Sequence, residues 1–149
     1  QVWLHIVHPC NRPTEPLSPS LSEYRLRSLI DFGDEGGESK GLGLIPGKVL
    51  RMENWPGYPI PHVGWNNIAI KRDHPVFDKI RNEVDFYFVH SYSFCCQEPV
   101  EEFASTTYGL EFSSIVGRGN VLGFQFHPEK SQINGLRLLK NFSNWDGGT

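Results

Sequence analysis

The chain has 149 residues, of which 38% are hydrophobic and 21% charged, and its 14 basic and 17 acidic residues give a formal net charge of −3. This profile predicts one soluble globular domain and excludes a low-complexity chain, a collagen-like repeat and a coiled coil. The near-neutral charge provides no basic surface for nucleic acid or an anionic membrane, and the apolar runs are too short to cross a bilayer.

The three cysteines do not form the framework of a secreted disulfide protein, because Cys95 and Cys96 are adjacent and Cys10 stands alone. The first residues contain no leader pattern, so we expect a cytoplasmic protein. No group of His, Cys, Asp or Glu has metal-ligand spacing, and neither a metal nor a cofactor is expected. The chain begins with Gln1 instead of Met, which suggests a fragment.

The first half of the chain predicts short elements separated by loops, after a proline-rich stretch over residues 9–27. Asp73 is the expected N-cap of the one helix in this half. In chain order, we expect a loop over 33–43, a strand over 48–52, a loop over 54–61, a strand over 67–71 and a helix over 75–81.

The second half is more regular. A β-branched and aromatic run predicts a buried strand over 84–90, and glycines separate three further strands over 105–108, 110–116 and 120–126. A helix is expected over 134–145, because Leu136, Leu139, Phe142 and Trp145 recur at helical spacing. Strands flanked by helices indicate an α/β or α+β domain.

The segment from Gly123 to Ser131 (GFQFHPEKS) is the most informative one for chemistry. In an extended chain, side chains two residues apart project to the same side, so His127 and Glu129 can face one site. A carboxylate that orients an imidazole is the arrangement that prepares a general base for a nucleophile. The alternative is an ordinary exposed turn at the end of a strand.

Two further segments admit a functional interpretation. The exit of the strand FVHSY (residues 88–92) could present backbone amides and a hydroxyl to a ligand, although a core strand with a polar end is an equally simple account. Trp65, within PHVGWN (residues 61–66), suits an interaction anchor, but most lone tryptophans serve packing. A G-x-G at residues 41–43 lacks the strand and helix of a phosphate loop.

Taken in this order, the segments resemble one family. PHVGWN, FVHSY, TTYG (residues 106–109) and GFQFHPEKS, followed by GLRLLKNF, are similar to the class I glutamine amidotransferases, and more narrowly to the glutaminase subunits of imidazole glycerol phosphate synthase in histidine biosynthesis. The resemblance implies a flavodoxin-like α/β fold, of which this chain would hold the C-terminal two-thirds. We expect that part to contain a central, mostly parallel sheet, an antiparallel patch and a terminal helix. It divides the chain into an atypical segment over 1–27 and a partial amidotransferase domain over 28–149.

The resemblance also implies roles for individual residues. His127 matches the family's catalytic base, and Glu129 matches the carboxylate that orients it. Glu35 matches a residue that recognises the α-amino group of glutamine, and Ser91 and Tyr92 match the strand exit that helps to hold this substrate.

A partner is implied as well. Trp65, Asn66 and Lys130 lie in segments that face a cyclase subunit, a (β/α)8 barrel, in this family. Ammonia released from glutamine would pass into that barrel, where it would be incorporated to form imidazole glycerol phosphate. Glutamine and the cyclase are therefore the expected partners, with no nucleic acid and no membrane.

The pattern breaks where the family carries its nucleophile, a cysteine in a tight G-x-C-x-G turn. That turn should fall at Leu21–Arg25, where Glu23 takes the place of the cysteine and no glycine is present, and Arg27 replaces a substrate-binding glutamine. Cys10 lies in HPCNRP, which makes no such turn. The chain could therefore be a catalytically inactive subunit that still binds the cyclase.

Two explanations of residues 1–27 stay open: true decay of the segment, or a reading-frame slip or mis-called start. The sharp return of the family pattern near residue 28 favours the second. Loss of the first strands would expose apolar sheet surface, so we expect the isolated chain to be marginally stable. Another class I amidotransferase or a γ-glutamyl hydrolase is a weaker alternative, which PHVGWN argues against.

Overall fold

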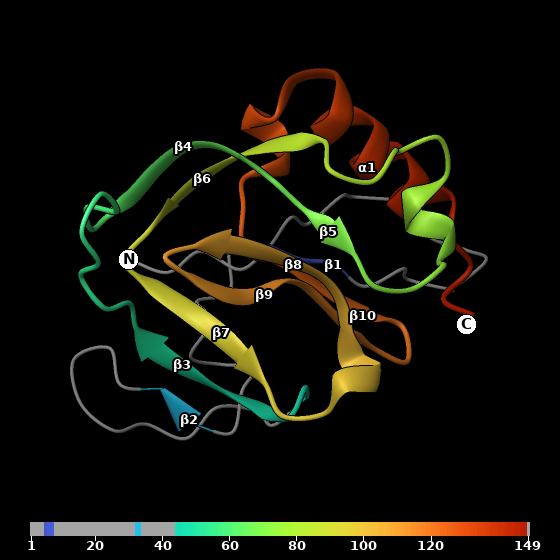
Figure 1. The fold of residues 1–149 in the computed structure, drawn as a ribbon. Coiled ribbons are helices and arrows are strands. Elements are labelled where there is room, and N and C mark those ends of the chain that lie inside the picture. The colour runs from blue at the N-terminus through green and yellow to red at the C-terminus, as the bar shows by residue number, and fades with distance from the viewer. Residues whose placement is uncertain (1–4, 8–31, 34–43, 149) are drawn as a thin grey trace.

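A computed structural model describes residues 5–7, 32–33 and 44–148, and the arrangement of its elements is shown in Figure 1. Within these residues there are ten strands, three short 3-10 helices and one α-helix. The strands are β1 (His5–Val7), β2 (Phe32–Gly33), β3 (Gly47–Arg51), β4 (His62–Asn67), β5 (Ala69–Ile70), β6 (Asp85–His90), β7 (Tyr92–Cys96), β8 (Glu102–Tyr108), β9 (Leu110–Arg118) and β10 (Val121–Phe124). The helices are η2 (Pro75–Phe77), η3 (Pro99–Glu101), η4 (Pro128–Lys130) and α1 (Gln132–Asn144).

The centre of the fold is the antiparallel meander β8–β9–β10. Gly109 joins the first two strands with a φ of +74°, and Gly119 lies in the turn between the last two with a φ of +57°. Both glycines adopt backbone conformations that side chains disfavour, which lets the chain reverse within one or two residues. The prediction of three strands separated by glycines is confirmed.

The main sheet has the order β1–β10–β9–β7–β3–β2, with β8 beside β9 and β5 beside β8. Parallel pairing occurs between β2 and β3, and the other pairings among the described strands are antiparallel. The sequence had led us to expect a mostly parallel sheet, which is wrong for this part of the chain. Parallel neighbours need long crossover connections, whereas β8, β9 and β10 are joined by turns that allow only antiparallel partners.

Among residues 44–148, two strands lie where the sequence predicted none. Residues 62–67 form β4, which pairs with β6 in a separate two-stranded sheet, and Gly64 within β4 has a φ of +141°. Residues 92–96 form β7, which pairs with β3 along its whole length. Gly33 was assigned to a loop and instead pairs with Val49 as part of β2.

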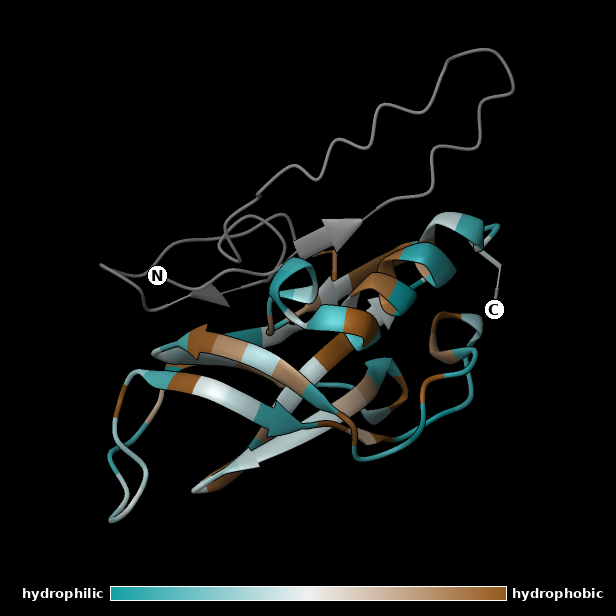
Figure 2. Ribbon diagram, turned by 90° about the horizontal axis from the view of Figure 1, so that it is seen from above, coloured by the Kyte–Doolittle hydropathy of each residue, from teal (hydrophilic) through white to brown (hydrophobic). Residues whose placement is uncertain are grey.

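Helix α1 covers one side of the sheets (Figure 1), and hydrophobic residues line the inner sides of the helix and strands (Figure 2). The larger core cluster joins residues of β6, β8, β9, β10, η2 and α1. A smaller cluster contains Ile45, Val49, Phe94 and Val116, from the segment around β3, β7 and β9. The domain is thus a mixed helix-and-sheet structure, in agreement with the expected α/β class.

The predicted helix over 134–145 is confirmed as α1, but its buried face differs from the expected one. Gly135, Leu138 and Phe142 are buried, whereas Leu136 is 60% exposed. A side-chain carbon at position 135 would collide with the carbonyl oxygen of Pro128, so the helix packs closely with this face inward. The glycine therefore sets the rotation of the helix.

The predicted helix over 75–81 is shorter than expected. It is the 3-10 turn η2, and it ends before Lys79, which has a φ of +57°. The expected cap Asp73 is wrong, because the Nδ1 atom of His74 accepts the hydrogen bond from the Val76 amide at 3.2 Å.

Candidate active site

The site is built around the turn that follows β10. The His127 amide donates to the Tyr87 carbonyl at 2.9 Å, which anchors the turn to β6. Pro128 then begins η4, because its fixed φ suits the first position of a helix and it needs no amide partner there. The turn buries His127, with 7% of the residue exposed, and leaves Glu129 at the surface.

The side chains of His127 and Glu129 meet directly, with 2.8 Å between Nδ1 and Oε1. A carboxylate only accepts hydrogen bonds, so Nδ1 of His127 donates in this contact, which fixes the orientation of the ring. The contact predicted from spacing is therefore present. Its backbone differs from the extended chain we expected, because Glu129 lies in η4 and the turn brings the carboxylate to the ring.

Ser131 holds this turn in place, and the sequence analysis did not identify it. Its buried hydroxyl accepts a hydrogen bond from the Tyr87 amide at 2.9 Å and donates one to the His127 carbonyl at 2.6 Å. Together with the bond from the His127 amide to Tyr87, the bond from the Tyr87 amide joins the turn to β6 at two points, and the bond to the His127 carbonyl closes the turn itself. The position of a serine just before a helical pattern was a signal for a structural role.

Of the expected substrate-holding residues, Ser91 lies between β6 and β7, and Tyr92 begins β7. The Ser91 carbonyl accepts a hydrogen bond from the Met52 amide at 2.9 Å. The Tyr92 carbonyl accepts one from Nδ1 of His90 at 2.8 Å. Both residues are half-buried. The Met52 amide and the His90 ring thus each hold one of the two backbone carbonyls in place.

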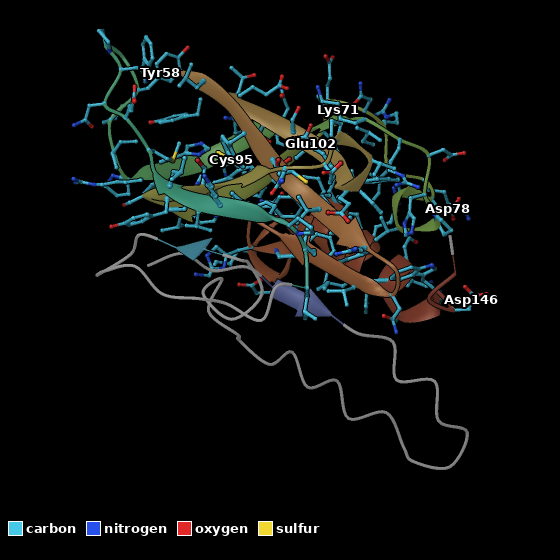
Figure 3. The ribbon with its side chains drawn as sticks, turned by 90° about the horizontal axis from the view of Figure 1, so that it is seen from below. Tyr58, Lys71, Asp78, Cys95, Glu102 and Asp146 are labelled. Atoms are coloured by element: carbon cyan, nitrogen blue, oxygen red, sulfur yellow. The ribbon has the colours of Figure 1, made fainter. Side chains whose placement is uncertain are left out.

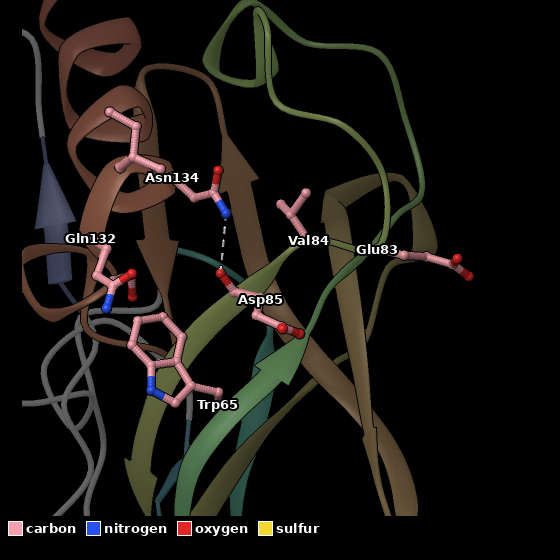
Figure 4. A pocket seen from close by; sticks show the side chains of 8 residues that line it. Trp65, Glu83, Val84, Asp85, Gln132 and Asn134 are labelled. Carbon is pink, nitrogen blue, oxygen red and sulfur yellow. Dashed lines mark hydrogen bonds between the residues drawn. The ribbon is translucent and has the colours of Figure 1, made fainter.

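The expected partner-facing residues are divided between two surfaces. Trp65 is 47% exposed, and its ring contacts Tyr87 edge to face with 5.7 Å between centroids. It lines a cavity of about 430 Å³ together with residues 83–85 and residues 131–134 (Figure 4). Lys130, which precedes the second of these segments, is exposed. Asn66 projects to the other face of β4, as alternate strand residues do, and donates to the Thr107 carbonyl at 3.0 Å.

The two cysteines in the described residues, Cys95 and Cys96, lie in strand β7. The residue Cys95 is exposed, but its thiol is partly covered by the protein. This partial burial, together with the negative charge of nearby Glu102, raises the pKa of the thiol (Figure 3). Burial raises the pKa of the Cys96 thiol to about 11, and this thiol donates a hydrogen bond to the Glu98 carbonyl at 3.2 Å. A raised pKa lowers the thiolate fraction, so neither thiol has the character of an activated nucleophile.

Three sequence-derived assignments fall outside the residues that the structure describes: Glu35, Cys10 and the expected nucleophile turn at 21–25. Across residues 44–148, no three His, Cys, Asp or Glu side chains come together as a metal site would require. No helix in the described part of the chain has the length and apolar character needed to cross a membrane.

Most of this chain is similar in sequence to known proteins. The family model for class I glutamine amidotransferases matches residues 45–144. Imidazole glycerol phosphate synthase subunit HisH of Azospirillum brasilense is 46% identical over 121 residues, which are 80% of this chain and 63% of the relative. The subunit HisH of Symbiobacterium thermophilum is 45% identical over 117 residues (78% and 54%), and HisH 2 of Vibrio vulnificus is 42% identical over 120 residues (80% and 56%). The chain therefore spans between about half and two thirds of the length of these relatives.

Proposed function

Because this chain belongs to the class I glutamine amidotransferases, we propose that it serves as the glutaminase subunit of an imidazole glycerol phosphate synthase. In that role glutamine and water give glutamate and ammonia, and the ammonia passes to a cyclase subunit for histidine biosynthesis. The observation that carries this proposal is the 2.8 Å contact between His127 and Glu129. It supplies an oriented imidazole at the position where the family requires a base.

In this proposal each residue has one task. By resemblance to the family, His127 would take the proton from a nucleophilic thiol through Nε2 and return it to the departing ammonia, and Glu129 would keep the ring in the required tautomer. Glutamine hydrolysis by this route requires a thiol that residues 21–25 do not contain. Glu35 recognises the α-amino group of glutamine. The backbone of Ser91 and Tyr92 holds the substrate, and it can do so because both carbonyls are already fixed by protein donors.

The residues proposed to contact the cyclase are Trp65 on one face of β4, Asn66 on the other face, and Lys130. Trp65 is a large exposed aromatic side chain, and residues of this kind are common energetic centres of interfaces. The exposed Lys130 adds a positive charge beside the turn that holds His127. Docking on this surface would place the partner next to the point where ammonia is released.

A second candidate function is a subunit that binds the cyclase without hydrolysing glutamine. One observation favours it: residues 21–25 read Leu-Ser-Glu-Tyr-Arg, with no cysteine and no glycine at the expected position of the nucleophile. Cys95 and Cys96 do not supply a replacement, because their thiols have raised pKa values. Such a subunit could still support turnover with free ammonia.

The two candidates separate when the chain is mixed with a cyclase subunit and supplied with glutamine. Glutamate formation that disappears in the His127→Ala variant supports the glutaminase. Cyclase binding with ammonia-dependent turnover, but no glutamate, supports the inactive docking subunit. Absence of both binding and glutamate formation would overturn the proposal for this chain.

A further inference from the structure

Two buried histidines lie beside the candidate site but outside the His127–Glu129 pair. His62 on β4 and His90 on β6 face each other directly across the two-stranded sheet. Only 2% of His62 and 1% of His90 is exposed. The His62 ring stacks on Tyr108 with 3.8 Å between centroids, and Phe88 stacks on it at 5.0 Å.

Both rings are neutral at physiological pH. Burial, with a further contribution from His90, lowers the pKa of His62 to about 3. Burial also lowers the pKa of His90 to about 4, and the nearby His127 acts in the same direction. Each ring therefore has one N–H group and one lone pair, and its neighbours determine which nitrogen carries the proton.

The hydrogen bonds leave only one arrangement of protons. The Tyr92 carbonyl can only accept, so Nδ1 of His90, at 2.8 Å, must donate to it. Nε2 of His90 is then a lone pair, and it accepts from Nδ1 of His62 at 2.8 Å. Nε2 of His62 is in turn left as an acceptor.

The chain of hydrogen bonds begins at Asn66. Its Oδ1 accepts from the Asn67 amide at 2.9 Å, which fixes the orientation of the side-chain amide. Its Nδ2 donates one hydrogen to the Thr107 carbonyl at 3.0 Å and has the other available for Nε2 of His62, at 3.4 Å. Along the path from Asn66 through His62 and His90 to the Tyr92 carbonyl, each group donates a hydrogen bond to the next.

A metal ion does not explain the pair. A tetrahedral zinc ion about 2.0–2.1 Å from each of two imidazole nitrogens would hold those nitrogens about 3.3 Å apart, whereas they are 2.8 Å apart here. The described residues also provide no third ligand of the usual kind. The contact is a hydrogen bond between two neutral rings.

We propose that His62 and His90 are positioning residues, which hold the Tyr92 carbonyl through a one-way hydrogen-bond chain that begins at Asn66. The chain links the strand proposed to face the cyclase with the strand exit proposed to hold glutamine, and this linking role rests on the proposed function. A partner that contacts Asn66 can thereby influence the substrate-holding backbone without touching it. The chain itself is a property of the fold and can be tested separately.

The first experiment measures the tautomers by NMR on the full chain labelled with ¹⁵N-histidine. Variants His62→Gln and His90→Gln identify the two rings. We expect both rings to be neutral and protonated at Nδ1, with ring protons that exchange slowly with water. A ring protonated at Nε2, or one that averages between tautomers, would overturn the chain.

The second experiment removes and restores the donor to Tyr92. His90→Phe leaves the carbonyl unpaired, whereas His90→Asn places a donor near the position of Nδ1. We expect amide hydrogen exchange around residues 91–93 to rise about tenfold in His90→Phe, as the loss of one hydrogen bond allows, and to return toward the parent value in His90→Asn. Equal exchange in both variants would mean that His90 acts through packing alone.

The third experiment adds a cyclase subunit while the ring signals of His62 and His90 are followed. We expect these signals to shift in the parent chain and in the control Asn67→Ala, and to shift at most half as far in Asn66→Ala at equal occupancy. If the cyclase binds and no ring signal moves, the linking role is wrong. If the cyclase does not bind while the tautomers are as expected, the proposed function fails and the positioning role stands.

Discussion

Two histidine pairs in this molecule have similar contact distances and opposite surroundings. His127 meets a carboxylate at 2.8 Å in a turn whose Glu129 side chain is 44% exposed, whereas His62 and His90 meet each other at 2.8 Å inside an aromatic core. The carboxylate orients the His127 ring through Nδ1. In the buried pair, every ring nitrogen is engaged by a neighbour. All three histidines are buried, so the identity of the partner, rather than burial or the presence of histidine, separates a candidate base from a positioning group.

The largest effect should come from the His127 ring. In a mixture with the cyclase that forms glutamate, we expect His127→Ala to lower the rate of glutamate formation by about 10²- to 10⁴-fold, the usual contribution of a general base. The measurement is glutamate release under saturating glutamine. Glu129→Gln is the matched variant. Its rate of glutamate formation should lie between those of the parent chain and His127→Ala, because the imidazole ring remains but loses the charge that orients it. An unchanged rate in His127→Ala would remove this residue from the mechanism.

For the free energy of unfolding we expect the opposite order, with a larger effect from the buried histidine pair than from the His127–Glu129 pair. His90→Ala leaves a cavity and two unpaired buried groups, so we expect a loss of about 2–4 kcal/mol in the free energy of unfolding. Glu129→Gln changes an exposed side chain and should cost about 1 kcal/mol or less. Urea denaturation of both variants measures the difference. A larger loss in Glu129→Gln than in His90→Ala would contradict the assignment of the buried pair to the structure.

Ser131 connects the two regions through β6, and its removal should have an intermediate effect. Ser131→Ala deprives the Tyr87 amide of its acceptor, and we expect a loss of about 1–3 kcal/mol of stability. Glutamate formation should also fall, because the turn that carries His127 is less firmly held. Ser143→Ala, at an exposed serine of α1 that contacts only the helix backbone, is the control. Equal stability of the two variants would show that the hydrogen bonds of Ser131 are not needed to hold the turn.

Mild acid should also lower the stability of the folded state. The pKa values of His62 and His90 are lowered in the folded state to about 3 and about 4, so the unfolded chain binds protons first when the pH falls below about 6.5. The stabilising contribution is thus complete above pH 6.5 and is lost progressively toward pH 4. Thermal melts between pH 7 and pH 5 should show a falling midpoint, with a weaker dependence in the double variant His62→Phe, His90→Phe. A midpoint that rises on acidification would contradict the neutral pair.

The sequence predicted those parts of the fold that depend on local pattern. The strands β6, β8, β9 and β10 and the helix α1 follow from periodicity and from glycines at the turns. Strand β4 was missed because its sequence contains Gly64 and several polar residues, and only the pairing with β6 stabilises it as a strand. Tertiary contacts of this kind override local propensity.

The same distinction applies to the site. The contact between His127 and Glu129 was predictable, because the two residues are separated by one position. The contact between His62 and His90 was not, because 28 positions separate them and neither residue has an unusual neighbour in the sequence. The role of Ser131 was hidden for a similar reason, since its partner Tyr87 lies 44 positions away.

Gly135 has a consequence for how this chain can evolve. Its lack of a side chain lets α1 pack against the carbonyl of Pro128, the residue between His127 and Glu129. Selection for a folded helix and selection for a correctly shaped turn therefore act on the same position. A lineage that abandons catalysis but still needs the folded domain keeps this glycine, and with it the shape of the turn. The geometry of the histidine and its carboxylate is thus inherited along with the fold and can outlast the reaction it once served.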